Sequence, residues 1–275
     1  MWRSLRVKRL ALDMKMESVL QDPSSFEWVR GKTPLSSPKW LLGAWMVYPV
    51  VVLSFKHFAG KRERGFSNSG KLTSFSAVHN LWLAIWSLIM FVGANVELYR
   101  YVASEGLKGV FCTLSSSRVP NRIYYWMYIF YISKFYELID TVIIVARKRE
   151  LTLLHVWHHS SVIFETWLWI DQGWTHASIG VWFNTLVHIF MYSYFCASIL
   201  KIKVPWRKHI TQLQIVQFIS SFVLTIPHLV LQIQSGWKCS GRTALYASVF
   251  FNMTYLILFI RFYATNYRTS KSKTG

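Results

Sequence analysis

The sequence predicts an all-α integral membrane protein in which seven transmembrane helices form a bundle. Of the 275 residues, 53% are apolar and only 16% are charged, whereas about a quarter of the residues in a soluble domain are charged. Long runs without charged residues recur along the chain, and a helix of about 20 mostly apolar residues is enough to cross a bilayer. Within these runs, polar residues recur at spacings of three and four, which places them on one face of a helix.

The seven predicted spans differ in how clearly the sequence marks them. Four contain no Lys, Arg, Asp or Glu, namely 72–96, 172–200, 209–237 and 243–260. Three are weaker, because 40–55 is short, 123–146 carries Lys134, Glu137 and Asp140, and 151–170 carries Glu165. We expect three regions: a basic, loosely ordered N-terminal arm (1–38), a seven-span membrane domain (39–264) and a basic C-terminal tail (265–275). No removable signal peptide is expected, because no small-residue cleavage site follows an N-terminal apolar segment.

The distribution of Lys and Arg predicts the orientation, because short loops that stay in the cytosol carry the excess. The loops after spans 1, 3 and 5 and the C-terminal tail hold 16 such residues, against 6 in the loops after spans 2, 4 and 6. This pattern predicts a cytosolic C-terminus and a lumenal N-terminus, although eight basic residues, seven in the N-terminal arm and Lys39 at its edge, then lie on the lumenal side. The net charge of +19 fits anionic lipid headgroups or an anionic substrate at the cytosolic face. It does not indicate nucleic acid, because the chain has no soluble basic domain.

The three cysteines are informative through their positions. Cys112 follows span 2 and Cys239 follows span 6, so both lie on the predicted lumenal side. An oxidising lumen permits a disulfide between them, and we predict that pair. Cys196 lies within span 5 and is expected only to pack.

Four spans carry polar residues, which are costly in a bilayer and mark functional sites by default. Taken singly, each polar residue is more easily explained as a buried group whose hydrogen bonds are satisfied. Lys134 and Glu137 are equally well explained as an ion pair with no catalytic role. With about 1.5 Å of rise per residue, however, the stripes reach similar depths from the cytosolic side. The sequence therefore predicts one cavity open to the cytosol, serving as an active site or a transport site. The stripes are Lys134, Glu137, Asp140 and Thr141; His155, His158 and His159; Asn184, His188, Met191 and Tyr192; and Thr211, Gln214 and Gln217.

Two function classes can be compared with this set of residues. A di-iron lipid desaturase or hydroxylase uses histidine boxes, and residues 155–159 could serve as one, but the sequence offers no further pair of this type. Imidazole suits iron or zinc, yet Lys134 would oppose a cation beside Glu137 and Asp140, so no metal is expected. A transporter is the less favoured alternative, because no span shows the Gly/Pro interruption of an unwound binding helix.

The four motifs together resemble those of the eukaryotic fatty acid elongase (ELO) family, the very-long-chain 3-oxoacyl-CoA synthases. They read KxxExxDT from Lys134, HxxHH from His155, NxxxHxxMYxY from Asn184 and TxxQxxQ from Thr211, and they occur in that order. The resemblance extends from the His79-Asn80 pair to residues 262–268. One departure is Phe195, where the family more often has tyrosine, and we expect it to adjust a hydrogen bond without abolishing activity.

The resemblance implies condensation of a long-chain acyl-CoA with malonyl-CoA, which releases CO2 and CoA and gives a 3-oxoacyl-CoA two carbons longer. It also implies residence in the endoplasmic reticulum membrane, an apolar tunnel for the acyl chain, no bound cofactor, and homo-oligomers or other enzymes of the elongation cycle as partners. A histidine in a low-dielectric cavity tends to be neutral and nucleophilic, so His155 is the expected nucleophile, with His158, His159 and His188 beside it. A general-base mechanism without acylation remains the alternative.

The remaining polar residues fit supporting roles in that reaction. Asn184, Gln214 and Gln217 could donate hydrogen bonds to a thioester or enolate oxygen, while Lys134, Glu137 and Asp140 complete the catalytic set. The phosphates of CoA suit basic loop residues. Those expected to bind them are Arg147, Lys148, Lys203, Lys208 and Arg268, chosen among neighbours that also include Arg149, Lys201, Arg207 and Arg261.

Overall fold

The structure is a computed structural model that describes residues 22–61, 70–114 and 121–268. These residues form α-helices with no strand among them, apart from an isolated antiparallel bridge between Leu114 and Cys239. The elements are α2 (Pro38–Lys61), α3 (Gly70–Phe111), α4 (Asn121–Tyr136), α5 (Ile139–Ala146), α6 (Leu153–Asp171), α7 (Ala177–Ile199), α8 (Arg207–Gln234), α9 (Arg242–Tyr263) and a terminal π-helix, η2 (Ala264–Arg268).

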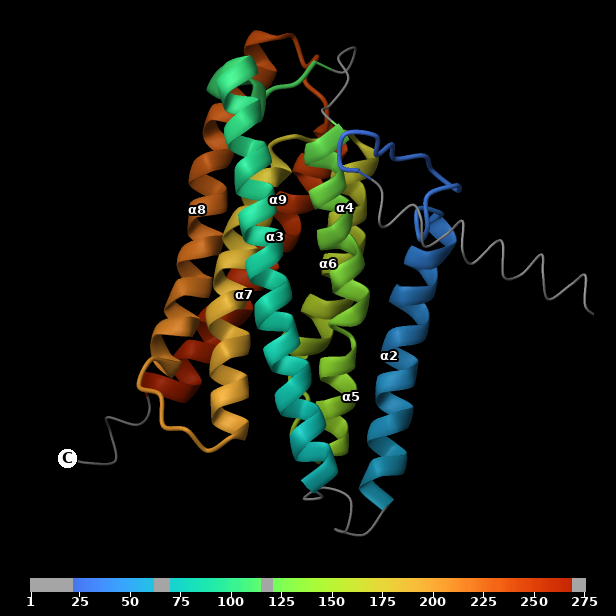
Figure 1. The fold of residues 1–275 in the computed structure, drawn as a ribbon, viewed down its shortest axis with the longest axis vertical. Coiled ribbons are helices and arrows are strands. Elements are labelled where there is room, and N and C mark those ends of the chain that lie inside the picture. The colour runs from blue at the N-terminus through green and yellow to red at the C-terminus, as the bar shows by residue number, and fades with distance from the viewer. Residues whose placement is uncertain (1–21, 62–69, 115–120, 269–275) are drawn as a thin grey trace, which may run out of the picture.

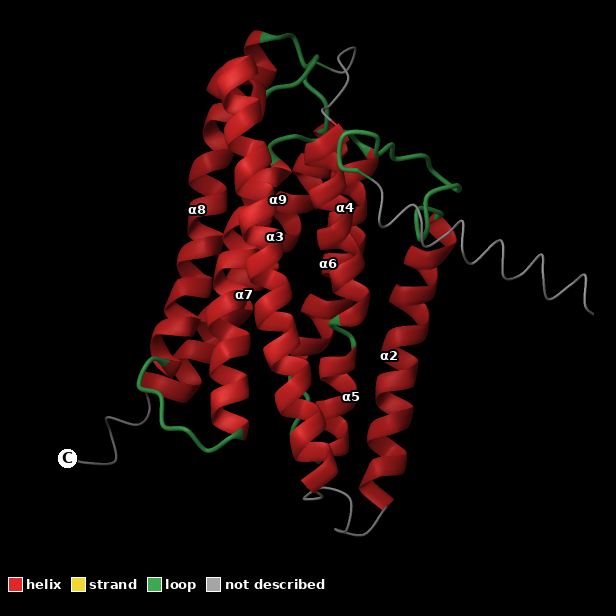
Figure 2. Cartoon of the chain, viewed as in Figure 1, coloured by secondary structure: helices red, strands yellow, loops and turns green. Residues whose placement is uncertain are grey.

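The long helices lie nearly parallel, and their connections gather at the two ends of the bundle (Figures 1 and 2). Helix α3 packs along α7, α8 packs along α9, and α6 contacts both α4 and α9. Helix α2 stands at one side against α5 and α6. We name the end that holds the link between Cys112 and Cys239 the disulfide end. The opposite end, where α5 leads to α6 and α7 leads to α8, is named the basic end.

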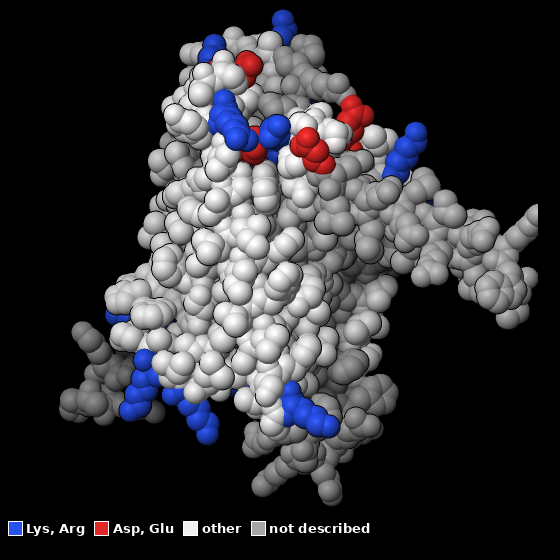
Figure 3. Space-filling view, in the orientation of Figure 1, with Lys and Arg blue, Asp and Glu red and all other residues white. Residues whose placement is uncertain are grey.

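Four of the described helices, namely α3, α7, α8 and α9 with its π-helical extension, are long and apolar enough to cross a membrane. Large apolar side chains such as Leu81 and Ile85 on α3 or Val223 and Ile226 on α8 are exposed on the outside of the bundle. In Figure 3 the visible Lys, Arg, Asp and Glu side chains lie toward the two ends, and the band between them is uncharged. The all-helical membrane class is therefore as predicted, and the other three predicted spans fall on α2, on α4 with α5, and on α6.

One predicted span is not a continuous helix. Helix α4 ends at Tyr136 and α5 begins at Ile139, and the backbone between them uses shorter-range hydrogen bonds. The amide of Leu138 donates to the carbonyl of Phe135 at 3.2 Å, and that of Asp140 donates to the carbonyl of Glu137 at 3.0 Å. Such i to i−3 bonds tighten a helix and often mark functional positions. The prediction of one uninterrupted helix over 123–146 was wrong at this point.

The described part of the N-terminal arm, residues 22–37, packs on the disulfide end of the bundle and differs there from the loosely ordered arm that we expected. The Phe26 ring stacks on Tyr128 with 5.1 Å between centroids and is only 1% exposed. The indole of Trp167 donates to the carbonyl of Ser36 at 2.9 Å. Burial of aromatic surface is thus what fastens this segment. Residues 1–21 lie outside the described part of the chain.

A disulfide joins the loop after α3 to the loop before α9. It links Cys112 and Cys239, the pair predicted from their positions in the loops. The two residues are 127 positions apart in the sequence, and their Cα atoms are 5.2 Å apart. The amide of Ser240 donates to the carbonyl of Thr113 at 2.8 Å beside it. Cys196, which lies in α7, is a free cysteine.

Candidate active site

A cavity of about 620 Å³ lies among α3, α5, α6, α7, α8 and α9, toward the basic end of the bundle. This volume is in the range of small-molecule sites. Members of all four polar stripes line it, as the matching depths in the sequence predict. Its polar lining includes Asn80, Glu137, Asp140, His155, His158, His159, Asn184, His188, Tyr192, Thr211, Gln214 and Gln217.

Helix α6 brings three histidines to the cavity at its first turns. The hydroxyl of Thr152 caps the helix by accepting from the backbone N–H of His155 at 3.2 Å, which satisfies one of the free amides of the first turn. The imidazole rings of His155 and His159 then lie 4.3 Å apart between centroids, and those of His158 and His159 lie 5.5 Å apart. The three histidines therefore form one continuous group, as their spacing predicts.

His155 is held by a chain of hydroxyl groups. Its Nε2 lies 2.8 Å from Oγ1 of Thr141 in α5, and that oxygen lies 2.7 Å from the hydroxyl of Tyr48 in α2. Three helices thus fix one imidazole ring. Thr141 belongs to a predicted stripe, but Tyr48 was not predicted as a site residue, because no polar periodicity marks it in the apolar run 40–55.

Asp140 connects the cavity wall to two further helices. Its Oδ1 lies 2.8 Å from Nε2 of His79 in α3, and its Oδ2 accepts from the hydroxyl of Tyr192 in α7 at 2.8 Å. Each carboxylate oxygen therefore has a partner on another helix, which connects α5 to α3 and α7 around the site. Only the resemblance pointed to His79, and its partner could not be read from the sequence.

Lys134 lies behind the cavity wall and is completely buried. Its ammonium group donates to Oε1 of Glu137 at 2.7 Å and to Oδ1 of Asn184 at 3.1 Å. Nδ1 of His188 lies 3.7 Å from the same Glu137 oxygen. The lysine, placed with the catalytic residues from the sequence, thus reaches the cavity only through Glu137 and Asn184, which line it.

Helix α8 closes the cavity opposite the histidines with Thr211, Gln214 and Gln217. The amide nitrogen of Gln214 lies 3.5 Å from Sδ of Met191. A thioether is a weak acceptor, so this amide keeps hydrogen-bonding capacity for a ligand. The predicted glutamine stripe does face the cavity.

The basic residues at the cavity mouth are only partly those expected. Arg147, Arg149 and Arg207 line the cavity, whereas Lys148, Lys203 and Lys208 do not. The side chain of Arg268 lies outside the described part of the structure. The charge of a loop residue does not predict whether it lines the cavity, because it does not show which side chains point inward.

Arg147 is fixed by α3 as well as by its own helix. Its Nε donates to the hydroxyl of Ser76 at 3.2 Å. Desolvation and the neighbouring Arg149 lower the pKa of its guanidinium from the usual value, but an arginine remains cationic in proteins. The mouth therefore carries fixed positive charge.

The geometry and the sequence agree with one family. The model of the ELO family, described as the GNS1/SUR4 family, matches residues 33–275. The chain belongs to the ELO family. The match includes every residue that lines the cavity.

Curated relatives of this ELO-family chain are named as fatty acid elongases. A putative fatty acid elongase of Dictyostelium discoideum is 37% identical over 261 residues, which cover 94% of this chain and 86% of the relative. The fatty acid elongase sre1 of the same organism is 33% identical, with 92% of each chain covered. The long chain fatty acid elongase 1 of Caenorhabditis elegans is 33% identical over 81% of this chain and 76% of its own. No solved structure matches.

Proposed function

We propose that this protein condenses a long-chain fatty acyl-CoA with malonyl-CoA, releasing CO2 and CoA, to give a 3-oxoacyl-CoA that is two carbons longer. The observation that supports it most is the single cavity in which the α6 histidines meet His188, below a mouth lined by arginines. Imidazole is a capable nucleophile and base, and arginine suits phosphate. Membership in a family of fatty acid elongases supports the same reaction.

The proposed first step uses His155. Thr141 occupies Nε2 of the imidazole, so Nδ1 attacks the carbonyl carbon of the acyl thioester. The carbon–sulfur bond breaks, CoA leaves as a thiolate that takes up a proton, and an acyl-imidazole remains. Covalent catalysis of this kind divides one difficult step into two easier ones.

In the second step malonyl-CoA loses CO2, and the electron pair of the broken carbon–carbon bond forms an enolate. The enolate carbon attacks the acyl carbon, the bond to the imidazole breaks, and the imidazole takes up a proton from solvent, which regenerates His155. Amide groups of Asn184, Gln214 and Gln217 are placed on the cavity wall, where they can stabilise the negative oxygen. His159 and His188 assist proton transfer.

No oxidant, reductant or bound cofactor enters this balance, because decarboxylation supplies the carbanion. The cavity can therefore be explained without assigning the protein a di-iron desaturase or transporter function. We further propose seven membrane crossings in the endoplasmic reticulum, with the basic end and the C-terminus in the cytosol, malonyl-CoA and acyl-CoA arriving from that side, and the acyl chain directed toward the disulfide end. Homo-oligomers and contacts with other elongation enzymes belong to the same proposal.

The test is incubation of purified protein with labelled malonyl-CoA and acyl-CoAs of varied length, read by mass spectrometry. The wild type should form 3-oxoacyl-CoA, and His155→Ala should form none while keeping the wild-type melting temperature. His209→Ala is the matched control, because His209 is exposed and pairs with Gln212 at 2.8 Å. Absence of any new carbon–carbon bond with the wild type would exclude the proposed reaction.

A separate measurement decides between the covalent route and the general-base route. Intact-mass analysis after mixing with acyl-CoA alone should show one added acyl group on the wild type and none on His155→Ala. A protein that elongates but shows no acyl adduct would favour a histidine base acting in a complex of both substrates.

A further inference from the structure

Tyr48 on α2 is the outermost member of the hydroxyl chain beside His155. Its hydroxyl lies 2.7 Å from Oγ1 of Thr141, which lies 2.8 Å from Nε2 of the imidazole. Tyr48 is 8% exposed and Thr141 is 3% exposed, and neither lines the large cavity. An effect of Tyr48 on the reaction must therefore pass through Thr141.

The hydroxyl of Thr141 has one hydrogen for two neighbours. A hydroxyl group donates once and accepts twice, so Thr141 can donate to Tyr48 or to His155 but not to both. If it donates to Tyr48, Nε2 must carry its own hydrogen and donate it to Oγ1, which leaves Nδ1 without a proton. If it donates to Nε2, the proton of the neutral imidazole lies on Nδ1. The direction of one hydrogen bond thus selects the tautomer of His155.

The charge of Asp140 favours donation from Thr141 to Tyr48. The carboxylate of Asp140, the residue before Thr141, acts electrostatically on the Tyr48 hydroxyl. A negative charge attracts the hydroxyl hydrogen, which turns the lone pairs of the tyrosine oxygen toward Thr141. Tyr48 is then the acceptor of this pair, and the hydrogen of Thr141 points away from His155.

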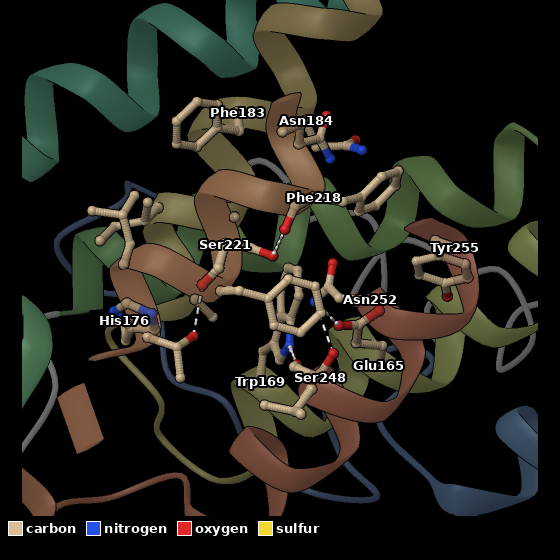
Figure 4. A pocket seen from close by; sticks show the side chains of 18 of the residues that line it. Glu165, Trp169, His176, Phe183, Asn184, Phe218, Ser221, Ser248, Asn252 and Tyr255 are labelled. Carbon is tan, nitrogen blue, oxygen red and sulfur yellow. Dashed lines mark hydrogen bonds between the residues drawn. The ribbon is translucent and has the colours of Figure 1, made fainter. Parts of the chain in front are cut away.

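A second tyrosine–hydroxyl pair near the histidines lacks this connection. Tyr255 lies on the wall of a smaller cavity of about 70 Å³ between α6, α7, α8 and α9 (Figure 4), and its hydroxyl is 2.7 Å from Oγ of Ser161. The hydroxyl of Ser161 donates to the backbone carbonyl of Trp157. That chain therefore ends on its own helix, whereas the chain from Tyr48 ends on an imidazole nitrogen.

We propose that Tyr48 is a positioning residue that holds His155 in the tautomer whose Nδ1 is free to attack the acyl thioester. The inference rests on the proposed function. Removal of the phenolic oxygen would leave the hydrogen of Thr141 with Nε2 as its remaining acceptor. The proton of the ring would then move to Nδ1, the atom that must attack.

The hydroxyl chain should favour the transition state over the bound substrate. As Nδ1 bonds to the acyl carbon, positive charge spreads over the ring to the Nε2–H group. Hydrogen bonds to charged groups are stronger than those between neutral groups, and each bond of a chain polarises the next. Tyr48 should therefore affect kcat and leave KM for the acyl-CoA near its wild-type value.

The experiment follows Tyr48→Phe in full-length protein reconstituted in lipid nanodiscs. With isotope-labelled histidine, the NMR shifts of the ring nitrogens report which nitrogen of His155 is protonated, and the signal absent from His155→Ala assigns the residue. The wild type should carry the proton on Nε2, and Tyr48→Phe should show a mixture with the Nδ1–H form. With acyl-CoA and labelled malonyl-CoA, kcat of Tyr48→Phe should fall roughly tenfold while KM stays unchanged.

Two further variants test how Tyr48 acts. Tyr131→Phe is the matched control, because it removes a hydrogen bond from another buried tyrosine, to the carbonyl of Leu35 at 2.8 Å, and Tyr131 lines neither cavity. It should keep the wild-type tautomer and kcat. Tyr48→Phe combined with Thr141→Val should be no slower than Thr141→Val alone, because Tyr48 acts through Thr141.

The NMR comparison decides the proposal independently of turnover. The proposal is overturned if Tyr48→Phe keeps the wild-type tautomer, or if the substitutions of Tyr48 and Thr141 slow the reaction additively. A wild type that already carries its proton on Nδ1 overturns it as well. If the wild type shows the expected tautomer but elongates nothing, the proposed function fails, whereas the tautomer of Tyr48→Phe still decides whether Tyr48 positions His155.

Discussion

The hydroxyl of Thr141 lies 2.8 Å from Nε2 of His155 and 2.7 Å from the hydroxyl of Tyr48. This relationship ties the proposed nucleophile to α5 and, through α5, to α2. Which imidazole nitrogen carries the proton depends on the hydrogen bond that the other nitrogen makes. Thr141 is therefore a positioning residue for the chemistry of His155.

Replacement of Thr141 by valine should lower kcat about tenfold, equivalent to about 1.4 kcal/mol. Valine keeps the shape of threonine but offers no oxygen to Nε2, so the ring is no longer fixed in one tautomer. KM for the acyl-CoA should change little, because Thr141 does not line the cavity. Initial rates across substrate concentrations measure both constants.

Thr141→Ser is the control for this effect, since it restores the hydroxyl while losing only the methyl group. It should recover most of the wild-type kcat. Equal losses in the valine and serine variants would show that packing, and not the hydrogen bond, accounts for the loss.

Replacement of either partner of the buried ion pair between Lys134 and Glu137 should strongly lower the stability of the bundle. Lys134→Met leaves Glu137 without its ammonium donor, and removal of one partner of a buried pair costs about 3–5 kcal/mol. Thermal unfolding in detergent should show a correspondingly lower melting temperature. The double variant Lys134→Met with Glu137→Gln should lose less than the sum of the two single variants, because each single change removes the same interaction. Additive losses would mean that the two groups are not coupled.

The arginines at the cavity mouth should contribute to binding of CoA. Arg149→Gln should raise KM for malonyl-CoA about tenfold, because a hydrogen bond to a charged group contributes about 1.5–3 kcal/mol. The effect should shrink with added salt, while kcat stays near the wild-type value. Lys203→Gln is the matched control, since Lys203 does not line the cavity. An equal rise in KM for both variants would indicate general surface attraction and not a specific contact.

The core of the site could be predicted because its residues break a strong rule. Ionisable residues are rare in membrane helices, so Glu137, Asp140 and the HxxHH histidines stand out against apolar neighbours. Helical periodicity then places each stripe on one face, and the structure brings these stripes to a common cavity.

Other parts could not be predicted, for different physical reasons. The break between α4 and α5 falls at Glu137 and Leu138, where no glycine or proline marks it. Tyr48 is one aromatic residue in an apolar helix, and only the packing of α2 beside α5 brings it to Thr141. The inward direction of Arg149 depends on how a loop folds over the cavity, which charge patterning does not encode.

The disulfide should stabilise the end of the bundle that lies opposite His155, His158 and His159 of α6. Cys112→Ser should lower the free energy of unfolding by about 2–5 kcal/mol, because the crosslink between Cys112 and Cys239 spans 127 residues and restricts the unfolded chain. Cys196→Ser is the matched control, since that thiol is free, and it should change stability little. Thermal unfolding with and without a reductant measures the effect, and reductant should lower the melting temperature of the wild type but not of Cys112→Ser. An identical response of both proteins to reductant would show that the crosslink does not account for the stability.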